Sequence, residues 1–446
     1  MTDGDAAGAD GLPALCAAVA AHDFAAAEAL VGAGADPDRV LPDGTTPLLR
    51  AVESGSPAVV RALLRDDARL RLPEAERARL LETARRWYEE GAQARLRRLT
   101  GEAGPAQTSW PDEQWCQVEQ ITLGALTVRA GHGAVLTALE SAFGVPAPPA
   151  ELVARAVRHP DPSHVDWAAS RFALGLRTSE GARELVTALR HHPSPHRRHF
   201  AADWLGSRQF FLHADTYPHH EEDRDLLADW AETETDAAVL TVVLWALTEH
   251  AEEHPRLEAI GLRYADHPDP RVRRKVPDCL AWHERPLTAQ VADVLSALTR
   301  DPDDEVRLGA ACALLAEGRE DGDGPRAVVR DLARDPHGPV RGGAAEVLAE
   351  SGDRTADATE VLLALLDTDD PILRLVGAYG LARRDHPYTP QAYARVEELG
   401  PVYRPDHRVN AVEDWCRRQA VGAGQEKGVR SGRQTVPGGG SVPSTR

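Results

Sequence analysis

Apolar positions recur with a fixed period over the C-terminal part of the chain. The pattern consists of an anchor residue, a second residue four positions later and a third residue eight positions later. Residues at this spacing lie on one face of an amphipathic helix. This stripe occurs eight times, with gaps of 32, 42, 33, 34, 34, 33 and 34 residues between successive anchors. The anchors are Val165, Arg197, Val239, Val272, Val306, Val340, Leu373 and His407. Helices at so constant a spacing predict an all-α fold, an α-solenoid of stacked repeats.

Two segments of this array have nearly the same sequence. Asp301-Pro-Asp-Asp-Glu-Val-Arg-Leu-Gly-Ala-Ala corresponds to Asp335-Pro-His-Gly-Pro-Val-Arg-Gly-Gly-Ala-Ala. The pattern resembles the HEAT repeat, in which a short helix and an Asp-Pro turn precede a second helix that opens with Val-Arg. The resemblance covers residues 151–420 and implies that the second helices line a concave groove.

An arginine follows the anchor in six of the eight repeats, at Arg198, Arg273, Arg307, Arg341, Arg374 and Arg408. These arginines could form a basic ladder for phosphates. Alternatively, each could pair with an aspartate in a neighbouring turn, for which Asp301, Asp335 and Asp369 are available. The second interpretation is favoured because the arginine belongs to the signature of the repeat.

A different pattern, with a period of 33 residues, occupies residues 12–100. Thr46-Pro-Leu-Leu-Arg-Ala follows Asp43-Gly, and Leu15, Ala18 and Val19 match Leu48, Ala51 and Val52 in this register. Gly and Asp favour the turn, and a proline at the first helical position loses no hydrogen bond. The pattern resembles the ankyrin repeat, with a leucine where that family has a histidine, and implies two good repeats and a degenerate third.

Residues 101–150 fit neither period and are predicted to join the two arrays. Apolar residues around Gly124 suggest a β-hairpin, and His132 to Phe143 is expected to form a helix that ends at Gly144. Residues 1–11 are expected to be disordered, and so is the Gly-, Ser- and Pro-rich tail at 421–446.

Composition narrows the class of protein. The 446 residues include 51 Lys and Arg against 70 Asp and Glu, a net charge of −19 that opposes non-specific binding to nucleic acid. Only two basic residues are lysine, a bias typical of GC-rich codons and of an actinobacterium-like bacterial source. The absence of a long apolar run or a secretory leader favours a cytoplasmic protein. Five scattered cysteines argue against disulfides and a cysteine-rich zinc site.

The 42-residue gap indicates an insertion within residues 207–222. Insertions in repeat proteins form loops and often a binding face. Phe210, Phe211 and Tyr217 could anchor a partner there, or the two phenylalanines could fold back beneath the loop. The nearby His213, His219, His220, Glu221 and Glu222 lack a recognised ligand spacing, so we expect a solvated loop and no metal.

Candidate partner-binding residues lie on the second helices, at positions that point away from the predicted core stripe. They are Trp167, Asp203, Trp245, Asp278 and Trp282, to which the insertion adds Phe210 and Phe211. Tryptophan is a frequent anchor at interfaces. Inter-repeat packing is the alternative explanation for these tryptophans.

These observations predict a non-catalytic adaptor or scaffold that binds a protein partner through the concave groove and the aromatic insertion. No catalytic motif is present, and no cofactor is expected. The alternative is a HEAT-like DNA-binding protein or DNA-alkylation-repair glycosylase, which would use the same Trp and Asp residues around a base. The acidic net charge and the ankyrin section count against it.

Overall fold

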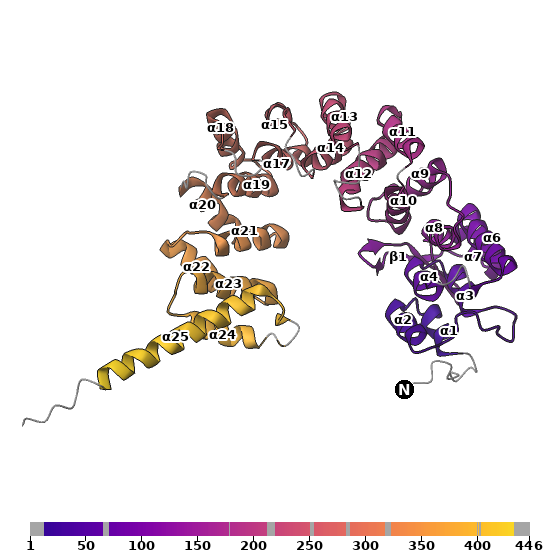
Figure 1. The fold of residues 1–446 in the computed structure, drawn as a ribbon, viewed down its shortest axis with the longest axis horizontal. Coiled ribbons are helices and arrows are strands. Elements are labelled where there is room, and N and C mark those ends of the chain that lie inside the picture. Colours follow the sequence, from indigo (N-terminus) through magenta and orange to yellow (C-terminus); the bar gives the residue numbers. More distant parts are fainter. Residues whose placement is uncertain are drawn as a thin grey trace, which may run out of the picture. The chain divides into compact units, whose positions relative to one another are not determined.

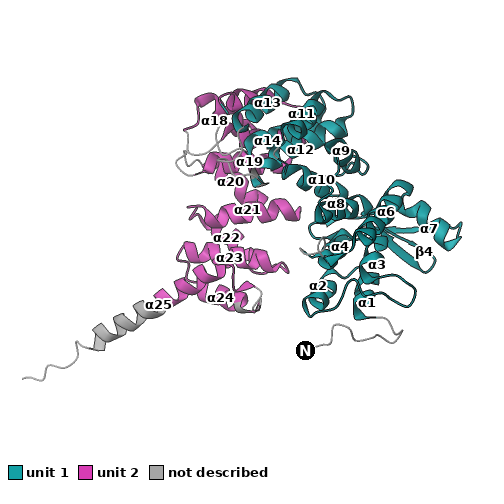
Figure 2. Cartoon of the chain, turned by 45° about the vertical axis from the view of Figure 1, so that its right-hand side comes forward, with its two compact units in different colours: residues 1–254 teal, residues 255–446 magenta. Residues whose placement is uncertain are grey.

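The computed structural model describes residues 13–65, 71–177, 179–211, 219–249, 254–281, 286–316, 323–398, 400 and 403–431. The chain forms two compact units, residues 1–254 and 255–446, which are treated separately below (Figure 2). Helices dominate both units, and within each unit they stack in chain order (Figure 1). The predicted all-α solenoid is therefore confirmed.

Unit 1 begins with two antiparallel helix pairs, α1 (Ala14–Ala20) with α2 (Phe24–Gly32) and α3 (Pro47–Ser54) with α4 (Pro57–Leu64). Local caps define these helices. The Thr46 hydroxyl accepts a hydrogen bond from Leu49 N (3.1 Å), and Pro47 occupies the first turn. Gly55 ends α3 in the left-handed region (φ 72°), where glycine carries no Cβ penalty.

The next part of unit 1 joins the two arrays. The helices α6 (Glu74–Glu90) and α7 (Ala92–Thr100) precede a three-stranded antiparallel sheet, in which β4 (Gln120–Leu123) lies between β1 (Gln107–Ser109) and β5 (Leu126–Arg129). The β4–β5 hairpin turns at Gly124, as the sequence predicts, with Gln120 opposite Arg129. A second, two-stranded sheet pairs β2 (Asp112–Glu113) with β3 (Cys116–Gln117).

Helix α8 (His132–Phe143) follows the hairpin and packs on both α4 and α6. The contact is close. A Cβ on Gly55 would lie 1.9 Å from the Arg129 carbonyl oxygen and 2.5 Å from His132 Cε1. The loop between α3 and α4 can therefore touch the joining segment only with glycine at this position.

The described residues of unit 1 within the predicted HEAT-like array form six α-helices. They are α9 (Pro149–Ala156), α10 (Val165–Gly175), α11 (Glu180–Ala188), α12 (Pro195–Phe211), α13 (His220–Thr233) and α14 (Ala237–Thr248). A 3-10 turn at Leu189–His191 connects α11 to α12. Part of the predicted insertion loop is helical, because α12 continues to Phe211 and α13 begins at His220. Residues 212–218, including His213 and Tyr217, lie outside the described residues.

The predicted core stripe of α10 is only partly correct, because its anchor Val165 is buried but its other two members are not. Trp167, Ser170 and Leu174 are its buried face, whereas Ala169 and Ala173 are only half-buried. The reason is the neighbour of this helix. α10 packs against α8 of the joining segment as well as α9, so its inward face is rotated relative to the repeat.

Unit 2 begins with α15 (Leu257–Tyr264), α16 (Pro270–Arg273), α17 (Val276–Leu280), α18 (Ala289–Leu298), α19 (Asp304–Leu315) and α20 (Asp323–Leu332). It ends with α21 (Gly338–Glu350), α22 (Ala356–Leu365), α23 (Pro371–Arg383), α24 (Thr389–Glu397) and α25 (His407–Ser431). The anchors Val272, Val306, Val340 and Leu373 are buried as predicted, but His407 is exposed and Val409 takes the buried place in α25.

The chain is divided differently from the predicted segments. The boundary between the units falls within the predicted HEAT-like array of residues 151–420. Helix α25 extends to Ser431, ten residues past the expected start of the tail at 421. The expected disordered ends at 1–11 and 432–446 lie outside the described residues.

The arginines after the anchors bind their own or neighbouring turns. Arg273 forms two hydrogen bonds with the Asp301 carboxylate of the next repeat (2.7 and 2.8 Å), which confirms that predicted pairing. Arg198 does the same with Glu234 (2.9 and 3.1 Å). Arg307 and Arg341 donate to carbonyl oxygens of the Asp-Pro turn that precedes their own helix. Arg198 and Arg273 therefore link neighbouring repeats, whereas Arg307 and Arg341 stabilise the turn of their own repeat.

Candidate functional site

A groove with a volume of about 990 Å³ lies in unit 1, lined by residues of α4, α8 and α10 and of the β2–β3 hairpin. Seven alanines contribute to its wall, so we call it the alanine-rich groove. They are Ala134, Ala138, Ala142, Ala147, Ala168, Ala169 and Ala173. Small side chains leave a broad hollow rather than a filled interface. The volume is at the upper end of the range for ligand-binding pockets.

The edge of the groove carries large apolar side chains on α10. Phe172 and Leu176 are 52% and 54% exposed, and they follow Val165 and Ala169 at helical spacing. Helix α10 thus carries an apolar stripe that starts at the buried Val165 and continues to the exposed Phe172 and Leu176 at the groove. An exposed apolar stripe beside a hollow is typical of an interaction surface.

The charges around the groove are mostly arginines. Arg61 lies on α4 and Arg65 directly follows it, while Arg171 and Arg177 lie on and just after α10. Arg171 is paired with Asp203 (2.8 Å). Arg61, Arg65 and Arg177 form no ion pair with a carboxylate among the residues that the structure describes.

The two carboxylates that line the groove are already neutralised. Glu113 pairs with Arg129 (2.7 Å), and Glu140 pairs with Arg155 (2.6 Å) and Arg85 (3.3 Å). The groove is therefore locally positive in a chain whose net charge is −19. Burial also raises the pKa of the Cys116 thiol in its wall, which keeps that group neutral.

The β2–β3 hairpin stands beside the groove and presents a tryptophan. Its turn, Gln114–Trp115, has φ values of 49° and 71°. Both residues are in the left-handed region, which a two-residue hairpin turn normally fills with Asn or Gly. Trp115 is fully exposed. A strained backbone and an exposed indole together point to function, because neither stabilises the fold.

Glu113 anchors this hairpin to the ankyrin section. Its Oε1 accepts hydrogen bonds from Ser56 Oγ (2.9 Å) and Ala58 N (2.6 Å) at the start of α4, while Oε2 accepts from Arg129. Gln114 next to it accepts from Arg61. The base of the hairpin is therefore rigid although its tip is in solvent.

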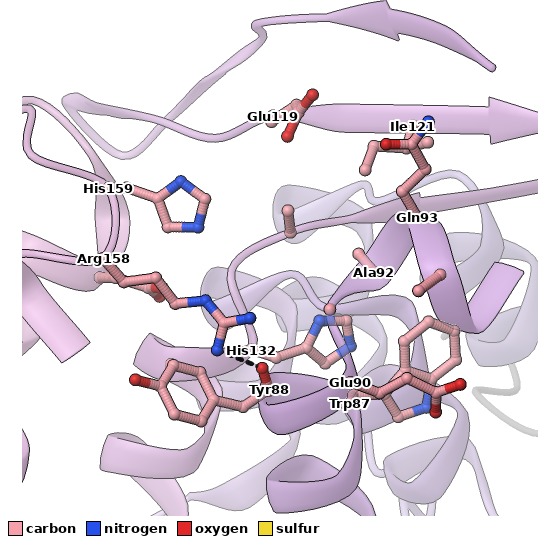
Figure 3. A pocket seen from close by; sticks show the side chains of 15 residues that line it. Trp87, Tyr88, Glu90, Ala92, Gln93, Glu119, Ile121, His132, Arg158 and His159 are labelled. Atoms are coloured by element: carbon pink, nitrogen blue, oxygen red, sulfur yellow. Dashed lines mark hydrogen bonds between the residues drawn. The ribbon is translucent and has the colours of Figure 1, made fainter. Parts of the chain in front are cut away.

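A second pocket, of about 310 Å³, lies between α6, α7, β4 and α8 (Figure 3). Trp87 and His132 stack in its wall with ring centroids 4.8 Å apart, and Arg158 lies over the ring of Tyr88 (4.6 Å) and donates to the Tyr88 carbonyl. Burial lowers the pKa of His132 to about 4, so this imidazole is neutral.

Asp166 closes the same pocket and caps a helix of another segment. Its Oδ1 accepts from Ala134 N (2.6 Å) in the first turn of α8, which has no cap of its own. Burial raises the pKa of Asp166 to about 7, against the hydrogen bond from Ala134 and the charges of Arg158 and Arg155. Since its polar groups serve the fold, this pocket is the weaker candidate site.

The structure does not bring the predicted partner-binding residues together. The prediction that Trp167 and Asp203 face a groove is wrong, because both are buried and Trp167 Nε1 donates to Asp203 Oδ2 (2.6 Å). Trp245 is half-buried. A Cβ on Gly206 would lie 2.6 Å from its ring, so it packs against α12. These contacts match the alternative of inter-repeat packing.

The other predicted residues occupy separate places. Phe210 is exposed near the end of α12, and the side chain of Phe211 is not described. Asp278 is exposed in unit 2 and lies 3.5 Å from Lys275 Nζ. Trp282 lies outside the described residues. His219 contacts Glu180 and Glu222 through single ring nitrogens, and no metal-binding group of three His, Cys, Asp or Glu occurs among the described residues.

Comparison with known families matches both repeat patterns. Residues 15–64 match ankyrin repeats, and residues 291–382 match HEAT repeats.

The chain combines ankyrin repeats with HEAT repeats. Both families are generally protein-interaction modules, so the class of partner that they indicate is protein. The X-ray structure of Escherichia coli YibA is similar, with 18% identity and a TM-score of 0.43, over 61% of this chain and 93% of YibA. No curated protein sequence matches the chain. None of the described helices has the length and apolarity needed to cross a bilayer.

Sequence reasoning missed Trp115, Phe172 and Leu176. Gln-Trp is not a recognised turn sequence, so the sequence did not predict the short hairpin that exposes Trp115. Phe172 and Leu176 lie outside the repeat stripe, and only the rotation of α10 makes them neighbours of a hollow. The spacing Ala169, Phe172, Leu176 would have revealed a second apolar face of α10.

Proposed function

We propose that this ankyrin and HEAT-repeat protein is a non-catalytic adaptor that binds a segment of a protein partner in the alanine-rich groove. The observation that carries the proposal is the exposed apolar stripe Phe172–Leu176 beside a hollow of about 990 Å³. Both repeat families are generally protein-interaction modules, which supports the same conclusion.

The chemistry of the groove favours a peptide segment over a nucleic acid. The apolar part of its wall consists of seven alanines with Leu64, Leu152, Val165, Phe172 and Leu176 among others, a surface that suits aliphatic or aromatic side chains. Trp115 beside it offers the type of residue that most often dominates binding energy at interfaces. A nucleic-acid site would instead need stacking platforms along a continuous basic track.

Affinity capture from native extracts tests the proposal. The full-length chain is compared with Phe172→Ala/Leu176→Ala and with Trp115→Ala, because these exposed side chains can be removed without opening the core. Leu99→Ala is the matched control, since Leu99 is 53% exposed on α7 and does not line the groove.

The expected result is that a set of proteins is lost from both groove variants and retained by Leu99→Ala. Crosslinking through a photoreactive residue at position 176 should then identify a segment of one of them. If every captured protein survives both groove variants, the groove is not the partner site and the proposal fails.

A further inference from the structure

We infer that the alanine-rich groove selects an acidic protein segment, one with aliphatic or aromatic side chains flanked by Asp or Glu. This inference rests on the proposed function and specifies the chemistry of the partner. It is carried by the charge of the groove, which is opposite to that of the whole chain.

Three arginines supply this charge. Arg61 is exposed on α4, and Arg65 is exposed at the residue that ends this helix (φ 54°). Both line the groove. Arg177 follows α10 and donates to the Ala147 carbonyl (2.6 Å), which fixes the side chain without neutralising it. Burial lowers the pKa of Arg177, and the charge of Glu140 opposes this effect in part.

The carboxylates of the site cannot satisfy these arginines. Glu113 is used by Arg129 and by the start of α4, and Glu140 is used by Arg155, which is fully buried. A partner carboxylate would therefore meet arginines without displacing an existing ion pair. A guanidinium can bind a carboxylate through two parallel hydrogen bonds, which gives orientation as well as attraction.

The apolar part of the groove sets the second requirement. Phe172, Leu176 and the alanines offer few hydrogen-bonding groups, so charged groups of a partner would not bury this apolar part of the groove. The partner must also bring apolar side chains. This requirement separates a protein segment from a nucleic-acid backbone, whose phosphates could satisfy the arginines but not the alanine wall.

Fluorescence anisotropy with the full-length chain tests this inference. Three short labelled peptides share one length: an acidic peptide with Leu and Phe at helical spacing, the same peptide with each Glu replaced by Lys, and the acidic peptide with Ser at its apolar positions. A labelled single-stranded DNA oligonucleotide is the fourth probe.

We expect the acidic apolar peptide to bind at least about tenfold more tightly than the other two peptides, and more weakly as ionic strength rises from about 0.05 to about 0.3 M. Arg65→Glu should reduce its affinity and raise that of the basic peptide, whereas the matched Arg97→Glu on α7 should change neither. Leu176→Ser should weaken the acidic peptide, while Leu99→Ser should not.

Equal affinity for the acidic and basic peptides overturns the inference. So does acidic-peptide binding that survives both Arg65→Glu and Leu176→Ser. DNA that binds in competition with the peptide, with dependence on Arg65 but not on Leu176, assigns the arginines to phosphates and also overturns it. If the capture experiment shows groove-dependent proteins while the peptides fail, only the acidic specificity is wrong. If capture shows none, the proposed function itself has failed.

Discussion

Replacement of Glu113 by Ala should strongly destabilise the junction between the ankyrin repeats and the joining segment. Glu113 is 6% exposed and joins Ser56, Ala58 and Arg129 through a single carboxylate. Its removal leaves Arg129, whose side chain is 11% exposed, without a carboxylate partner, and leaves the Ala58 amide unsatisfied.

Breaking a buried ion pair from one side costs about 3–5 kcal/mol, and a lost buried hydrogen bond about 1–3 kcal/mol. These contributions overlap, so we expect about 3–5 kcal/mol for Glu113→Ala. Repeat arrays do not unfold in one step, which makes a local measurement preferable to a global melt. Hydrogen exchange at the Ala58 amide reports the contact directly, and a loss of about 3 kcal/mol corresponds to roughly hundredfold faster exchange.

Glu82→Ala is the matched control, because Glu82 is exposed on α6 and its ion pair with Arg86 is worth less than about 1 kcal/mol. Arg129→Ala should cost less in the Glu113→Ala background than in the natural protein. Unchanged exchange at Ala58, or strictly additive effects of the two substitutions, would refute this account of the junction.

Three further predictions concern other close contacts. Gly55→Ala should destabilise unit 1 by several kcal/mol, because the new Cβ would lie 1.9 Å from the Arg129 carbonyl oxygen. Gly34→Ala is the control, since nothing lies within 4 Å of its Cβ and it should act only through the positive φ of Gly34. Urea unfolding compares the stabilities of the two variants. Between about pH 4 and 7 the folded protein retains a proton on Asp166 that the unfolded chain releases, so the stability of the natural protein falls as pH rises. Asp166→Asn should remove this pH dependence. A variant whose stability has the same slope against pH would contradict the raised pKa of Asp166. Arg384→Met should destabilise unit 2 by about 2–4 kcal/mol in chemical unfolding. The reason is that Arg384 donates hydrogen bonds to the carbonyl oxygens of Asp353, Ala349, Gly380 and Leu348. Arg417→Met is the control and should change stability little, because Arg417 is exposed.

The periodic pattern predicts the helices of unit 2 well, because each repeat there packs between two similar repeats. Val272, Val306 and Val340 are buried at successive anchors for this reason. The ankyrin turn at Thr46-Pro47 is equally predictable, since its cap and its proline act locally. In both cases the residues that determine the local structure lie within one repeat length of each other.

The candidate site could not be predicted in the same way, because it depends on how one helix is rotated. In α10 each residue advances by about 100°, so a change of neighbour moves side chains from one face to another. Trp167 becomes buried and binds Asp203, while Phe172 and Leu176 become exposed. Helical period alone gives no information on this rotation, since it is set by the non-repeating helix α8.

The same non-repeating segment explains why the groove can bind a partner with little rearrangement. Glu113 caps α4 from the joining segment, and Asp166 of α10 caps α8, so each buried carboxylate fixes the helix that precedes it along the chain. These contacts hold α4 and α8, two of the three helices that line the groove, and of the two carboxylates only Glu113 reaches the groove surface. Arg61, Phe172 and Leu176 can engage a partner while Glu113 and Asp166 keep their hydrogen bonds. A site that is already ordered loses less conformational entropy on binding, which favours affinity for a segment that must itself become ordered.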